Sequence, residues 1–106
     1  MDESIAFQII LYAGNARSTA MEALGLARQK NFLLAEEKIE ESNQELLKAH
    51  KFQTELIQSE ARGELQGQIS ILLIHAQDHL MNAMTVRELA SELIDLRQEL
   101  ESKESK

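Results

Sequence analysis

The chain has 106 residues, with 18 acidic against 11 basic side chains, a formal charge of −7, no proline, no cysteine and no tryptophan. This length suits one domain, so we expect residues 1–106 to form a single unit. The lack of cysteine excludes disulfides, thiol catalysis and cysteine-ligated metals. The acidic balance argues against nucleic acid and anionic membranes as partners.

Aromatic residues are only 4 % of the chain, and alanine, leucine and glutamate dominate it, which favours an all-helical fold over a sheet. No apolar run approaches the roughly 18 residues that a membrane span needs. The acidic start, Met1 to Ser4, does not resemble a secretory signal. We therefore expect a soluble, cytoplasmic protein.

Two weak points divide the chain into three helical segments. At Gln29-Lys30-Asn31, Asn31 suits the left-handed conformation that ends a helix. The second weak point is the segment from Arg62 to Gly67, in which two glycines bracket a short connection. The predicted helices run over about 4–29, 32–62 and 68–101.

Each predicted helix carries an apolar stripe at spacings of three and four residues. Long helices joined by short loops predict an antiparallel three-helix bundle. The first stripe is mostly alanine, which indicates closely approaching helices, whereas the first half of the third helix has more apolar surface than two partners can cover. We therefore expect self-association. The stripes are Ile5, Ile9, Ala13, Ala16, Ala20, Ala23 and Ala27; Phe32, Ala35, Ile39, Ser42, Leu46, Ala49, Gln53 and Leu56; and Ile69, Leu72, Leu73, Ala76, Leu80, Ala83, Ala90 and Leu93.

Polar side chains interrupt the apolar surface of the third helix. His75, Asp78, His79 and Asn82 fall within about 100° of one helix face, with apolar residues above and below them. Because burying unpaired polar groups costs several kcal/mol, this cluster is the candidate functional site.

Three interpretations of the cluster are open. It forms a hydrogen-bonded polar layer that fixes the register of a structural or adaptor bundle. Alternatively, His75 and His79 bind one metal ion, although the glutamate of the zinc-protease helix motif is replaced by Ala76. In the third interpretation His75 is a nucleophile that carries a phosphoryl group. No nucleotide-binding motif is present, so the phosphoryl group would come from another protein.

The segment from Leu72 to Met81, LLIHAQDHLM, resembles the phosphorylation motif of the lactose/cellobiose family of IIA proteins, which belong to the bacterial phosphoenolpyruvate-dependent sugar phosphotransferase system. Two further stretches agree with this family: Ile9 to Ser18, IILYAGNARS, and Ala49 to Ile57, AHKFQTELI. His79 after Asp78 looks more like the cellobiose or diacetylchitobiose branch than the lactose branch.

The resemblance implies a phosphocarrier that acts in the uptake of a β-disaccharide such as cellobiose. By similarity, His75 receives phosphate from the phosphohistidine of the protein HPr and passes it to a cysteine of the cognate IIB protein. The family resemblance also implies a homotrimer with nine helices, in which three copies of Asp78 converge on the axis. A divalent ion, Mg²⁺, would neutralise these carboxylates.

Three other polar residues have supporting interpretations. Gln77 matches the family motif but lies about 160° from His75, so if it assists the phosphoryl group, we expect it to do so on a neighbouring subunit. His79 either hydrogen-bonds the phosphate or the His75 ring, or fills a polar layer. His50 is interpreted as an interhelical hydrogen bonder outside the site.

Overall fold

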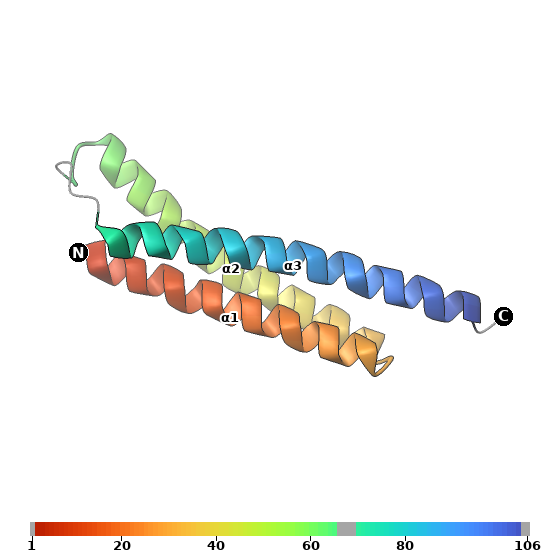
Figure 1. Ribbon diagram of the computed structural model, residues 1–106. Coiled ribbons are helices and arrows are strands. Elements are labelled where there is room, and N and C mark those ends of the chain that lie inside the picture. The colour runs from red at the N-terminus through yellow and green to blue at the C-terminus, as the bar shows by residue number, and fades with distance from the viewer. Residues whose placement is uncertain (1, 66–69, 105–106) are drawn as a thin grey trace.

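The computed structural model describes residues 2–65 and 70–104, which form three helices and, within these ranges, no strand. The helices are α1 (Asp2–Arg28), α2 (Phe32–Ala61) and α3 (Ile71–Glu104). They lie side by side in a rod of 62 × 19 × 17 Å, in which α1 and α3 point the same way and α2 runs antiparallel to both (Figure 1). The prediction of an all-helical three-helix bundle is confirmed. None of the described helices is apolar enough over a sufficient length to cross a membrane.

Alanine dominates the buried face of α1. Ala13, Ala16, Ala20 and Ala23 are each 0 % exposed, as the sequence pattern predicts. Because alanine extends only one carbon from the backbone, the facing helices approach closely enough for the buried Ser42 Oγ of α2 to donate a hydrogen bond of 2.7 Å to the Ala16 carbonyl oxygen. This contact between a side chain and the neighbouring helix's backbone fixes how far α1 and α2 lie apart.

The turn after α1 corrects one expectation. The left-handed residue is Lys30, with φ 66°, whereas Asn31 has φ −95° and ψ 72°. The Lys30 N–H donates to the Ala27 oxygen and the Asn31 N–H to the Leu26 oxygen, each at 2.9 Å. This hydrogen-bond pattern requires the left-handed conformation two residues after the last helical one. Because α1 ends at Arg28, Lys30 is the residue that adopts the left-handed conformation, although asparagine tolerates this conformation better than lysine.

The second connection begins with the same pattern. Gly63 has φ 76° and its N–H donates to the Glu60 oxygen, so α2 ends at Ala61, one residue earlier than predicted. Gly67 and the predicted helical positions 68 and 69 lie outside the described residues. Ser70 is not helical, because its Oγ accepts a hydrogen bond of 3.1 Å from the Leu73 N–H and caps α3.

At its other end α3 extends to Glu104, three residues beyond the predicted end at 101. No proline or glycine follows to stop it, and Glu101 pairs with Lys30 at 3.4 Å. Leu93, predicted in the core, is 47 % exposed, and its neighbour Ile94 is buried instead. The buried face of α3 continues from Ala90 by a step of four residues, which selects Ile94.

One row of large apolar side chains on α3 stays largely exposed in the described part of the chain. We call this row, together with Asp78 and Thr85 that lie in it, the α3 seam. Its spacings of three and four residues continue along the helix, and its apolar members are 47 % to 85 % exposed. The apolar surplus predicted for the first half of the third helix is therefore present, and it continues through the second half, which the prediction did not include. The apolar residues are Ile71, Ile74, Met81, Leu89, Leu93, Leu96 and Leu100.

Candidate functional site

Two imidazole rings meet one turn apart on α3. The Nε2 atoms of His75 and His79 lie 3.1 Å apart. The rings are edge-to-face, with centroids 4.5 Å apart and an interplanar angle of 87°. His75 is exposed to solvent and His79 is half-buried. At this distance one Nε2 donates a proton to the other, so the pair acts as one hydrogen-bonded unit with an accessible outer ring.

Asp78 points elsewhere although it lies between the two histidines in the sequence. It is exposed on the α3 seam, about 60° around the helix from His75. Within the described residues no hydrogen bond or ion pair joins it to either histidine. The predicted cluster therefore divides into a histidine pair and a separate carboxylate.

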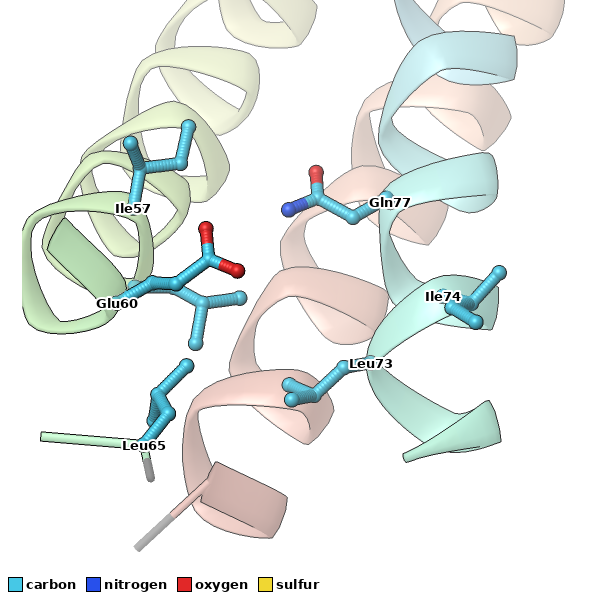
Figure 2. A pocket seen from close by; sticks show the side chains of 7 residues that line it. Ile57, Glu60, Leu65, Leu73, Ile74 and Gln77 are labelled. Atoms are coloured by element: carbon cyan, nitrogen blue, oxygen red, sulfur yellow. The ribbon is translucent and has the colours of Figure 1, made fainter. Parts of the chain in front are cut away.

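Gln77 lies on the far side of α3 and faces α2. The Gln53 side-chain amide donates a hydrogen bond to the Gln77 oxygen. Gln77 also lies at the edge of a small cavity of about 110 Å³ between α2 and α3, which apolar side chains and the Glu60 carboxylate surround (Figure 2). A supporting role of Gln77 on a neighbouring subunit stays a prediction.

His50 does not fulfil its expected role. It is exposed on α2, and among the described residues it has no hydrogen-bond partner, so its interpretation as an interhelical hydrogen bonder is wrong. Instead it lines a groove of about 560 Å³ between α2 and α3 with Glu40, Leu47 and Arg87. The rotation of α2 about its axis explains this placement. It turns the adjacent Ala49 into the core and leaves His50 on the face beside the groove.

A second groove, which the sequence reasoning missed, lies between α1 and α3 and contains His79. We call it the α1–α3 groove. Its volume is about 480 Å³, and it brings two of the family-like stretches together. Arg17 is its cationic side chain, and no carboxylate lines it. The lining residues are Ala13, Gly14, Arg17 and Ser18 from α1, and His79, Asn82, Thr85 and Val86 from α3.

The geometry favours one of the three interpretations of the cluster. A register-fixing polar layer requires a buried His75 with both ring nitrogens bonded, but His75 is exposed and its recorded partner, among the described residues, contacts Nε2 alone. For metal binding, the described residues provide no group of three or more histidine, cysteine or carboxylate side chains. An exposed imidazole oriented by a second imidazole suits a nucleophile that visiting proteins reach.

Comparison with known proteins shows that the chain is similar to members of one family. Residues 4–98 match the family described as "PTS system, Lactose/Cellobiose specific IIA subunit". The lichenan-specific phosphotransferase enzyme IIA component of Bacillus subtilis is 51 % identical over 98 residues, which cover 92 % of this chain and 88 % of that protein.

Two solved structures share the fold. The cellobiose-specific enzyme IIA of Bacillus anthracis has a TM-score of 0.92 and 59 % identity, with 97 % of this chain and 94 % of that chain covered. The Escherichia coli IIA(Chitobiose) protein, solved in complex with HPr, has a TM-score of 0.84 and 40 % identity, with 95 % and 97 % covered.

Proposed function

The chain belongs to the lactose/cellobiose-specific IIA family of the sugar phosphotransferase system, and from this premise we propose that it carries a phosphoryl group on His75 Nε2. The group is received from the phosphohistidine of HPr and delivered to a cysteine of the cognate IIB protein. The observation that carries the proposal is the exposed His75 ring, whose Nε2 lies against a second imidazole.

The histidine pair prepares the nucleophile. In the proposed state the His79 ring is protonated on Nε2, and this N–H donates a hydrogen bond to the lone pair of His75 Nε2. The His75 ring carries its own proton on Nδ1, so its Nε2 can act as the nucleophile. The incoming phosphorus displaces this hydrogen bond. His79 Nε2–H then lies beside the new phosphoryl oxygens and donates to one of them. Transfer in either direction is an in-line displacement, in which positioning supplies most of the catalysis.

The partners follow from the family. A relative with 40 % identity was solved in complex with HPr, which supports HPr as the donor, and the acceptor is the IIB protein of the same system. Relatives named for lichenan, cellobiose and chitobiose support a β-linked disaccharide such as cellobiose as the transported sugar. Cytoplasmic localisation, expected from the sequence, stays a prediction.

The α3 seam supports a homotrimer of nine helices. Seven large apolar side chains, each 47 % to 85 % exposed, repeat at coiled-coil spacing along α3. An exposed apolar stripe of this size marks an interaction surface, and the packing of three parallel copies of α3 would bury it. Asp78 lies within the seam, between Ile74 and Met81, so three Asp78 carboxylates meet at the axis of such a trimer.

Mg²⁺ fits this position, because it prefers carboxylate oxygen ligands. One chain supplies a single carboxylate, Asp78, so the ion would be held by the three copies of this residue together. When bound there, Mg²⁺ would neutralise three like charges that otherwise repel one another. Its role is in assembly, and the phosphoryl transfer itself depends on His75 and His79.

Phosphorylation by enzyme I, HPr and phosphoenolpyruvate tests the carrier function. Intact mass measurement should show one acid-labile phosphoryl group per chain, which His75→Ala abolishes without loss of helical circular dichroism. His50→Ala is the matched control, because His50 is an exposed histidine on α2, and it should retain the modification. A phosphorylated His75→Ala protein would refute the proposal.

Asp78→Leu tests the seam separately. Replacing the carboxylate by an apolar side chain should stabilise the trimer and remove its response to Mg²⁺ and chelator, as measured by analytical ultracentrifugation. If the wild-type chain sediments as a monomer with and without Mg²⁺, the trimer and its metal site are wrong, although the carrier function is still testable.

A further inference from the structure

The α1–α3 groove is unexplained by the proposed chemistry of His75, yet it begins at the histidine pair. His79 contacts His75 Nε2 at 3.1 Å and also lines the groove. We infer that this groove is a phosphate-binding subsite, in which Arg17 with Ser18 and Asn82 binds the oxygens of the phosphoryl group that enters or leaves His75. This inference rests on the proposed function and adds Arg17 as a residue that contacts the reacting group.

The charge of the groove favours an anion. Its lining has one guanidinium and no carboxylate, in a chain with a formal charge of −7. Arg17 is exposed, and among the described residues no acidic side chain pairs with it. Two acids of α1 and α2 pair with lysines instead: Glu22 with Lys38 at 3.3 Å and Glu45 with Lys48 at 3.3 Å.

The groove also supplies the donors that a phosphoryl dianion needs. Arg17 presents a planar set of N–H groups that matches phosphate oxygens, Ser18 has a hydroxyl, and Asn82 has a side-chain amide. None of these three side chains has a hydrogen-bond partner within the described part of the chain. They converge from two helices on one space of about 480 Å³, large enough for a phosphoryl group with part of its hydration shell.

Gly14 also lines the groove, without a side chain. It lies on α1 one turn before Arg17. A Cβ built at Gly14 meets no heavy atom within 4 Å, so the position is not small because of helix packing.

Phosphoramidate provides a test that needs no partner protein. The lone pair of His75 Nε2 attacks phosphorus, a new P–N bond forms, and the P–N bond of phosphoramidate breaks with its electron pair leaving on ammonia. If Arg17 binds the phosphoryl oxygens, it accelerates this reaction as well as transfer from phospho-HPr. A residue that only docks a partner protein affects the second reaction alone.

The experiment compares wild type, Arg17→Gln, Arg17→Lys and the control Arg97→Gln, an exposed arginine of α3 outside the groove. Loss of a charge-assisted hydrogen bond predicts a phosphoramidate rate about 10- to 100-fold lower in Arg17→Gln. Arg17→Lys should fall between, because it keeps the charge but loses the planar donors. Arg97→Gln should react at the wild-type rate.

Titration with inorganic phosphate, followed by ¹⁵N NMR, gives an independent measurement. We expect the Arg17 Nε–H and Asn82 amide signals to shift in the wild type, and the Asn82 shift to be lost in Arg17→Gln. An unchanged phosphoramidate rate in a folded Arg17→Gln protein, or a loss confined to transfer from phospho-HPr, would overturn the inference. If wild-type His75 accepts no phosphoryl group at all, the proposed function fails, and the phosphate titration still decides whether the groove binds the anion.

Discussion

The alanine face of α1 makes a quantitative prediction about packing. Ala16 is 0 % exposed, and its carbonyl oxygen accepts the 2.7 Å hydrogen bond from Ser42. Ala16→Leu adds three carbon atoms where this hydrogen bond joins α1 and α2. Overpacking a filled core costs about 1–3 kcal/mol. Displacing α2 also breaks the Ser42 hydrogen bond, at about 1 kcal/mol, so we expect a loss of about 2–4 kcal/mol.

Urea unfolding at a fixed protein concentration measures this loss, because association links stability to concentration. Gly25→Ala is the matched control on the same helix. Its new Cβ meets no heavy atom within 4 Å, so the higher helix propensity of alanine should raise the free energy of unfolding by about 0.5–1 kcal/mol. An Ala16→Leu protein within about 0.5 kcal/mol of the wild type would show that the helices separate easily, and the packing argument would be refuted.

Three smaller predictions concern the helix ends. Lys30→Gly should stabilise the chain by about 1 kcal/mol in urea unfolding, because Lys30 has φ 66° and its surface ion pair with Glu101 contributes little. Ser70→Ala should destabilise it by about 1 kcal/mol through loss of the α3 cap, and Ser70→Asp should restore the cap. The hydrogen bond from Arg62 lowers the pKa of Glu64. The contribution of this carboxylate is therefore present above its unfolded pKa and is lost as the pH falls through the folded value; Glu64→Gln should flatten the acid limb of the stability profile, and an unchanged limb would contradict this.

Much of the fold can be predicted from the sequence because helix periodicity is a local property. The stripe from Ile9 to Ala27 is buried as predicted, and Ala35, Ser42, Leu46 and Ala49 form the facing stripe of α2. The predictions fail where contacts or hydrogen bonds with other residues determine burial or backbone conformation. Leu93 and Ile94 are adjacent apolar residues, and only the rotation of α3 against α1 and α2 selects which one is buried. Lys30 likewise takes the left-handed position because hydrogen bonding fixes where α1 ends.

The site shows the same division. The spacing of His75 and His79 predicts that the two rings meet, since side chains four residues apart share a helix face, and the family resemblance depends on the same segment. Asp78 separates from the histidines, as the roughly 60° between them on the helix allows. Arg17, however, lies 62 positions before His79 in the sequence, and no pattern along the chain indicates that they line one groove.

The sequence by itself determined that this chain is helical, that its first helix packs closely through alanine, and that His75 and His79 share one face of the third helix. Each of these depends on residue types and on spacings within one helix. The tertiary structure decided which faces remain open: the α3 seam that carries Asp78, and the groove that joins Arg17 to the histidine pair. A groove belongs to two helices, and their relative rotation is set by packing summed over the whole core, which the spacing within either helix does not contain.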